Sequence, residues 1–194
     1  MSYETRPSVH VVSVVLGPAV RLQVQRGRLK PGERGSRVYD PAPLLAVDAL
    51  RVSDAGCLGR SGDSWVVDVH HRQHPDTRHR AEGPVSILTT GAYRALRKRY
   101  GAHVADGVAG ENVLVDSDLL LTDLTPAPLS IGAATLESVI VAEPCVEFSH
   151  WCAGTPPSVS ARADLNALRG GARGWLGIPA APALVAVGDV VRLG

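Results

Sequence analysis

The stretch Val141-Ala-Glu-Pro-Cys-Val-Glu-Phe-Ser-His-Trp-Cys152 follows a segment that has the residue pattern of a β-strand. Residues 134–141 alternate apolar and polar side chains, and this two-residue period predicts a half-buried strand. Pro144 has no N–H to donate, so it ends the hydrogen-bonded ladder. Cys145 is therefore expected where the strand gives way to a loop, so that its thiol is held rigidly and stays within reach of a ligand.

The sulfur of Cys145 has two interpretations. As a thiolate it is a nucleophile and a ligand for soft metals. As a buried thiol it is an ordinary packing group, because cysteine is among the most buried residue types. The three cysteines, Cys57, Cys145 and Cys152, cannot all pair with one another, and this odd number predicts a reducing compartment. The spacing of Cys145 and Cys152 does not match a CxxC zinc framework.

Length, composition and net charge limit the kinds of protein that this chain can be. The 194 residues suit one sizeable domain, and a hydrophobic content of 45% can build its core. A formal net charge of +1 gives no reason to expect a nucleic-acid or membrane-surface partner. The apolar run from Val9 to Val20 is interrupted by polar and turn residues and is too short to span a bilayer. We therefore expect a cytoplasmic protein.

Most of the chain has the pattern of short strands separated by Gly and Pro turns, with one or two helices. No βαβ alternation repeats, so the expected fold is mainly β (α+β) with a barrel or sandwich core. Residues 9–16 and 20–24 are predicted to form a hairpin around Gly17-Pro18. Residues 92–100 are predicted to form a helix that begins after a threonine cap.

Residues 70–79, His-His-Arg-Gln-His-Pro-Asp-Thr-Arg-His, contain four of the seven histidines of the chain. Imidazole is the commonest metal-ligating side chain, so His71, His74 and His79 are candidate ligands for a metal. Their spacing matches no standard zinc motif. Two other interpretations stay open, namely a polar loop that faces water, or one or two histidines that line a ligand pocket.

Six motifs succeed one another along the chain. They are Gly59-Arg-Ser-Gly-Asp63, a His and an Arg before Val85-Ser-Ile-Leu88, Gly107-Val-Ala-Gly-Glu-Asn112, Glu143-Pro-Cys145, Arg173-Gly-Trp175 and Val187-Gly-Asp-Val-Val-Arg192. In this order and spacing they resemble the MOSC domain, named after the C-terminal domain of molybdenum-cofactor sulfurases. The likeness begins near Val9, so residues 1–194 are expected to form a single MOSC domain with its core at about 9–193.

The resemblance implies a MOSC-type β-barrel and one essential cysteine, here Cys145. In related proteins this cysteine binds the molybdenum of a pterin cofactor or carries sulfur as a persulfide. Stand-alone relatives reduce N-hydroxylated small molecules such as hydroxylaminopurines and amidoximes, with electrons from separate flavin or iron–sulfur partners. The implied function is therefore a molybdenum-cofactor-dependent oxidoreductase with Cys145 as the metal ligand. Pyridoxal phosphate is not expected, because its Schiff base needs a lysine and only Lys30 and Lys98 exist.

The matched motifs also supply the residues expected around this cofactor. Arg60 or Arg80 would hold its anionic phosphate, and Asn112 would hydrogen-bond to the pterin edge. Glu111 would orient neighbouring groups or relay a proton; the alternative is a carboxylate that only fixes its own turn. The other expected cofactor contacts are Asp63, His71 and Arg173.

Two departures from the family pattern leave other functions open. Ser64-Trp65 follow the first motif where relatives carry Arg or His, and Phe148-Ser-His-Trp151 after the cysteine is unusual. A specialised enzyme without the molybdenum cofactor would use Cys145 as nucleophile or metal ligand. Its base or second ligand would be His150 or one of His70, His71, His74 and His79. A third hypothesis is a sulfur or cofactor carrier with a persulfide on Cys145.

Overall fold

Strands make up most of the regular secondary structure of the chain. The computed structural model describes residues 13–31, 38–154, 165–169 and 171–194. In these residues the elements are β1 (Val14–Gln25), β2 (Leu44–Val47), β3 (Ala49–Ser53), β4 (Gly56–Ser61), β5 (Ser64–Val67), β6 (Val85–Thr89), α1 (Thr90–Tyr100), β7 (Val113–Val115), the 3-10 helix η1 (Leu121–Asp123), β8 (Leu129–Ile131), β9 (Ala134–Val141), α2 (Val146–Ala153), β10 (Trp175–Pro179), β11 (Ala183–Ala186) and β12 (Val190–Leu193).

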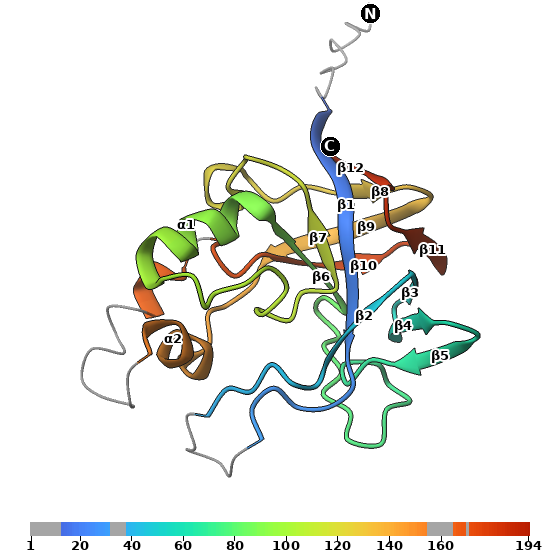
Figure 1. The fold of residues 1–194 in the computed structure, drawn as a ribbon. Helices are drawn as coiled ribbons and strands as arrows, with labels where there is room; N and C mark the ends of the chain where they lie inside the picture. Colours follow the sequence, from blue (N-terminus) through green and yellow to red (C-terminus); the bar gives the residue numbers. More distant parts are fainter. Residues whose placement is uncertain (1–12, 32–37, 155–164, 170) are drawn as a thin grey trace, which may run out of the picture.

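Seven strands close into a barrel (Figure 1). Their order is β12-β8-β9-β10-β6-β7-β1, and β1 pairs back with β12, so that Val14 lies opposite Leu193. All neighbours are antiparallel except β6 and β7, which are parallel because α1 crosses between them. β2 continues the sheet beside the end of β1, and β11-β3-β4-β5 form a second sheet. The predicted fold class, mainly β with a barrel, is confirmed.

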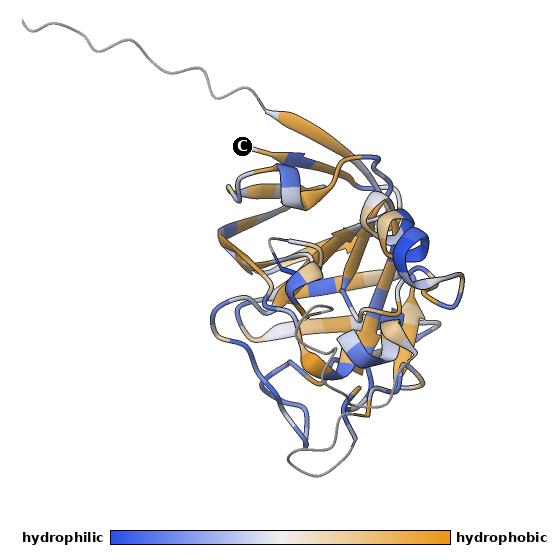
Figure 2. Ribbon diagram, turned by 90° about the vertical axis from the view of Figure 1, so that its left-hand side faces the viewer, coloured by the Kyte–Doolittle hydropathy of each residue, from blue (hydrophilic) through white to orange (hydrophobic). Residues whose placement is uncertain are grey.

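Two apolar clusters stabilise this arrangement. The larger one fills the barrel with inward-facing side chains, among them Leu22, Ile87 and Trp175. The smaller one lies beside the barrel, where Tyr93 of α1 and Phe148 of α2 pack together with the neighbouring loops. Figure 2 shows the strands mostly in the orange of apolar residues, whereas the blue of hydrophilic residues gathers on loops and on helical surface. The two helices lie on one side of the barrel (Figure 1), and the smaller apolar cluster fills the space between them and the barrel.

The predicted hairpin around Gly17-Pro18 is wrong. β1 runs through both residues as one strand, and residues 9–12 of the prediction lie outside the described part of the chain. Gly17 sits at a bulge in the pairing with β12 and has φ 140°, while the Pro18 carbonyl accepts a hydrogen bond from Asp116 N–H at 2.8 Å. A bulge absorbs the irregular backbone without reversing the chain, so local turn residues did not produce a turn.

Replacing Gly17 by Ala is expected to destabilise the barrel by about 2–4 kcal/mol. A Cβ at this position would lie 1.9 Å from the carbonyl oxygen of Asp116, and an L-residue rarely adopts this φ. Gly62→Ala is the matched control, because Gly62 also has positive φ but nothing within 4 Å, so it should cost only about 1 kcal/mol. Denaturant unfolding measures both values, and equal losses would contradict the packing argument.

The predicted first helix is confirmed, with its end at Tyr100, but α1 begins at Thr90, two residues before the predicted start. Thr89 Oγ1 accepts a hydrogen bond from Ala92 N–H at 3.2 Å, which satisfies one of the N–H groups at the start of α1. At the other end Gly101 N–H donates to the Arg97 carbonyl. No helix in the described ranges has the length and apolar character needed to cross a bilayer.

Candidate functional site

A cavity of about 490 Å³ lies between the barrel and the N-terminal end of α2. Segments that are far apart in the sequence contribute to its wall. They are residues 25–30, 69–82, 109–111, 142–145 and 173–176, together with Tyr39 and Ser86. Its size is within the range of pockets that enclose small molecules and cofactors.

Cys145 reaches this cavity from the junction between β9 and α2. The expected loop after Pro144 is only partly correct, because a helix begins at Val146 and Cys145 is its N-cap residue. The Cys145 carbonyl accepts hydrogen bonds from Ser149 N–H at 3.1 Å and Ser149 Oγ at 2.9 Å, which fixes the backbone. The thiol itself makes no capping hydrogen bond and is half-buried at the cavity wall. The start of α2 therefore fixes the position of the sulfur, and the sulfur makes no capping hydrogen bond to the helix.

A disulfide between Cys145 and Cys152 does not form. Both residues belong to α2, seven positions apart, which corresponds to about 10 Å along a helix. That separation exceeds the distance a disulfide can bridge. Cys152 is instead fully buried in the apolar cluster beside the barrel. Its role is packing, and none of the three cysteines is bridged.

Arg173 lies against the same part of the wall. Its guanidinium stacks over the Phe148 ring at 4.1 Å from the centroid. Its Nε and Nη1 atoms are buried and have no hydrogen-bond partner among the described residues. Burial opposes the charge, but the acidic groups around it, Cys145 foremost, outweigh burial and raise the pKa of Arg173. A charged guanidinium with two unused donors is prepared to bind an anionic group.

Glu111 faces the cavity from the turn before β7. Tyr93 Oη donates to Glu111 Oε2 at 2.7 Å and accepts from Ala109 N–H at 2.9 Å, so the carboxyl is held from α1. Glu111 Oε1 is buried without a partner in the described chain. Burial raises the pKa of Glu111 to about 7. At neutral pH this carboxyl can therefore both give and take a proton.

Basic side chains outnumber acidic ones around the cavity. The lining cations are Arg28, Lys30, Arg78, Arg80 and Arg173, and the lining carboxyl groups are Glu82, Glu111 and Glu143. Burial, followed by the nearby charge of Arg173, lowers the pKa of Arg80. Two guanidinium groups that repel each other in a partly dry site are stabilised when an anion enters between them.

Replacing Arg80 by Met is expected to raise the unfolding temperature of the ligand-free protein by roughly 2–4 °C, because the repulsion with Arg173 disappears. Inorganic phosphate should stabilise the wild-type protein by mass action and lose this effect in the variant. Arg72→Met is the control, since exposed Arg72 belongs to the same loop and pairs with Asp54 at 3.3 Å. A phosphate-induced shift of wild-type size in Arg80→Met would contradict this assignment.

The candidate metal ligands of the histidine-rich loop do not converge. His74 Nε2 lies 3.3 Å from the Arg26 carbonyl, His79 Nε2 lies 3.0 Å from the Asp54 carbonyl, and His71 Nδ1 accepts from Gln73 N–H. Within the described ranges no three His, Cys, Asp or Glu side chains gather in a way that would hold a metal ion. These three histidines therefore stabilise the loop.

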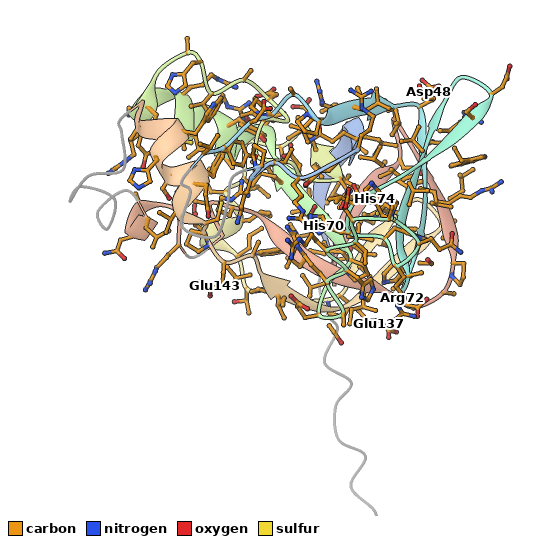
Figure 3. The ribbon with its side chains drawn as sticks, turned by 90° about the horizontal axis from the view of Figure 1, so that it is seen from below. Asp48, His70, Arg72, His74, Glu137 and Glu143 are labelled. Atoms are coloured by element: carbon orange, nitrogen blue, oxygen red, sulfur yellow. The ribbon has the colours of Figure 1, made fainter. Side chains whose placement is uncertain are left out.

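His70 is the histidine of this loop that lines the cavity. In Figure 3 it lies inside the outline of the molecule, whereas Arg72, Glu137 and Glu143 lie near its edge. His70 N–H donates to Asp68 Oδ1 at 2.7 Å, and this bond fixes the start of the loop.

Four of the other expected residues lie elsewhere. Asn112 is engaged within the protein, where its Oδ1 accepts from Ser86 and its Nδ2 donates to Gln23 and Asp68. Arg60 and Asp63 are exposed on β4 and the following turn, and they do not belong to the cavity wall. His150 is buried on α2 and is likewise not part of the wall.

Sequence reasoning missed several residues of the site. Tyr93 orients Glu111, and Arg28 and Tyr39 line the cavity from the segment between β1 and β2. Tyr93 is a buried residue of α1, and no sequence motif marks its hydroxyl. The closure of the barrel, rather than any local pattern, brings these residues together.

Comparison with known proteins identifies relatives of the whole fold. The YuaD protein from Bacillus subtilis is 18% identical, with 93% of this chain and 96% of that chain covered and a TM-score of 0.57. YiiM from Escherichia coli is 17% identical, with 77% and 64% covered and a TM-score of 0.52, so the match spans less than two thirds of YiiM. These low identities support the shared fold alone.

The sequence pattern of the MOSC domain matches residues 67–192, which is more than half of the chain. No protein of curated function gives a significant match. The matched region includes the Cys145 junction, Glu111, Arg80 and Arg173, which the structure brings to one cavity. The barrel and the sequence match agree, and the chain belongs to the MOSC domain family.

Proposed function

We propose that the chain binds a molybdenum cofactor in this cavity and reduces N-hydroxylated small molecules. The observation that carries the proposal is the position of Cys145. Its thiol makes no capping hydrogen bond and lies in the same cavity wall as Arg173, whose Nε and Nη1 donors have no partner among the described residues. A soft thiolate suits molybdenum, and a buried guanidinium suits the phosphate of the cofactor.

The lining residues fit this group in charge, size and hydrogen bonding. The wall has an excess of cations for a phosphate, and the cavity of about 490 Å³ suits a cofactor. Buried polar atoms without partners offer both kinds of bond, since Arg173 donates while His70 Nε2 and Glu111 Oε1 accept. The pterin carries its own sulfur ligands for the metal, so a single protein thiolate completes the set.

The cofactor, when bound, supplies the two-electron redox chemistry at molybdenum. Cys145 Sγ would hold the metal, and Arg80 and Arg173 would hold the phosphate. Tyr93 keeps Glu111 oriented, and Glu111 in its protonated form gives a proton to the departing hydroxyl. The overall reaction takes R–NH–OH, two protons and two electrons to R–NH₂ and water. A separate flavin or iron–sulfur protein delivers the electrons, and the proposal places the enzyme in the cytoplasm, where thiols stay reduced.

Metal and pterin analysis of freshly purified protein tests the proposal. Protein made in a host with cofactor synthesis should contain molybdenum and pterin in a near 1:1 ratio to chain, and should reduce a hydroxylaminopurine with a chemical electron donor. Protein from a host without cofactor synthesis is the control and should show neither property. Sulfane sulfur on Cys145 without molybdenum would contradict the proposal and favour a carrier, and activity in the cofactor-free protein would favour a different chemistry.

A further inference from the structure

The surrounding chain determines which ring nitrogen of His70 carries the proton. Its Nδ1 lies 2.7 Å from the carbonyl oxygen of Arg78, and a carbonyl oxygen can only accept. The proton must therefore be on Nδ1. Burial and the charge of Arg80 lower the pKa of His70 to about 3, so the ring is neutral at physiological pH. Its Nε2 consequently carries a lone pair and no hydrogen.

This lone pair has no partner among the described residues, although Nε2 is buried in the wall of the cavity. A buried acceptor without a partner is costly, so a group that fills the cavity gains by donating to it. Basic side chains also line this wall and could donate to an acceptor, but none of those described donates to Nε2, so the lone pair is available to a bound group.

The groups of the cofactor differ in the hydrogen bonds that they can make. Its phosphate is anionic and accepts hydrogen bonds, so it suits the guanidinium groups of Arg80 and Arg173, which also line the cavity. The pterin ring carries N–H donors, and an acceptor such as His70 Nε2 suits these donors rather than the phosphate.

We propose that His70 Nε2 accepts a hydrogen bond from an N–H group of the pterin ring and so positions the cofactor. This role rests on the proposed function and goes beyond it, because it assigns the part of the cavity wall at His70 to the pterin. It also differs from a metal ligand or a general base, since the nitrogen neither holds the metal nor takes a proton away. His70 is thus a positioning residue.

Two variants separate this role from loop anchoring. In His70→Gln the amide oxygen reaches about as far as Nε2 and can accept the pterin N–H, but the bond to the Arg78 carbonyl is lost. In His70→Asn the shorter amide can still donate to the Arg78 carbonyl, but no acceptor reaches the ligand. The proposal expects the Asn variant to retain at least tenfold less pterin and molybdenum after dilution, which corresponds to about 1.4 kcal/mol. The Gln variant should stay within about threefold of wild type.

Pterin fluorescence after oxidation, molybdenum content and unfolding temperature are the readouts. A loop-anchoring role predicts the reverse order, with Gln lowering the unfolding temperature and cofactor content and Asn preserving both. That order, equal losses in both variants, or full retention in both would overturn the assignment of His70. An unloaded wild-type protein would overturn the proposed function, and this inference with it.

Discussion

Replacing Cys145 by Ser is expected to remove molybdenum from the purified protein while making the fold slightly more stable. Under the proposed function the thiolate is the protein ligand of the metal, and a serine hydroxyl is a hard, protonated group that does not replace it. Cys145 is nevertheless an N-cap residue whose side chain makes no capping bond. Serine is among the preferred N-caps, so α2 should gain about 0.5–1 kcal/mol.

The opposite signs of the two effects make this test informative. Molybdenum and pterin content should fall to background, and the unfolding temperature should stay equal or rise. Cys152→Ala is the control, because it removes the other thiol of α2 from the apolar cluster. It should lower stability by about 1–3 kcal/mol without removing molybdenum. Full metal content in Cys145→Ser would contradict the proposed ligand.

Replacing Glu111 by Gln is expected to lower the rate of hydroxylamine reduction by about 10²- to 10³-fold, since a proton donor contributes that much. Gln has nearly the same shape, and its amide oxygen can still accept from Tyr93 Oη, so the orientation is kept. In the wild-type protein the rate should fall as pH rises above about 7, because the carboxyl loses its proton there. This decline should be absent in the variant.

The same carboxyl makes stability depend on pH. Burial raises its pKa from 4.5 to about 7 in the folded protein, so the folded state binds the proton more tightly than the unfolded state. Its contribution is fully present below pH 4.5 and is lost as pH rises through 7, by on the order of 3 kcal/mol. Denaturant unfolding at pH 5 and pH 8 should show a smaller loss in Glu111→Gln than in the wild type. Equal losses would show that Glu111 is already ionised when folded.

The fold follows from patterns that are local in the sequence. The alternation in residues 134–141 gave β9 with its limits, and the threonine cap predicted the helix over residues 92–100, which begins two residues earlier, at Thr90. Pro144 ended the strand ladder because proline has no N–H. Where local signals conflicted with long-range pairing, pairing prevailed. Gly17-Pro18 form a bulge in β1 rather than a turn, since β7 and β12 both pair with this strand.

The site was only partly predictable. Cys145, Glu111, Arg80 and Arg173 were expected from the motifs, and they line one cavity. Arg60 and Asp63, which belong to an equally suitable motif, lie on the second sheet instead. Composition cannot distinguish Arg60 from Arg173, because both are basic residues near glycine. The two arginines differ in the direction that the strand beside each of them takes relative to the barrel.

The amino-acid sequence alone determined a mainly β fold, because strand periodicity and chain-breaking residues act over a few positions. The family, its barrel and the thiol around which the site is built followed from the resemblance of the six motifs to the MOSC domain. The tertiary structure alone decided which polar atoms face the cavity without a partner. That outcome depends on bonds such as Gln25 Nε2 to the Gly110 carbonyl, 85 residues apart. A lone pair on His70, a second oxygen on Glu111 and two donors of Arg173 stay available because the distant segments packed around them supply no partner.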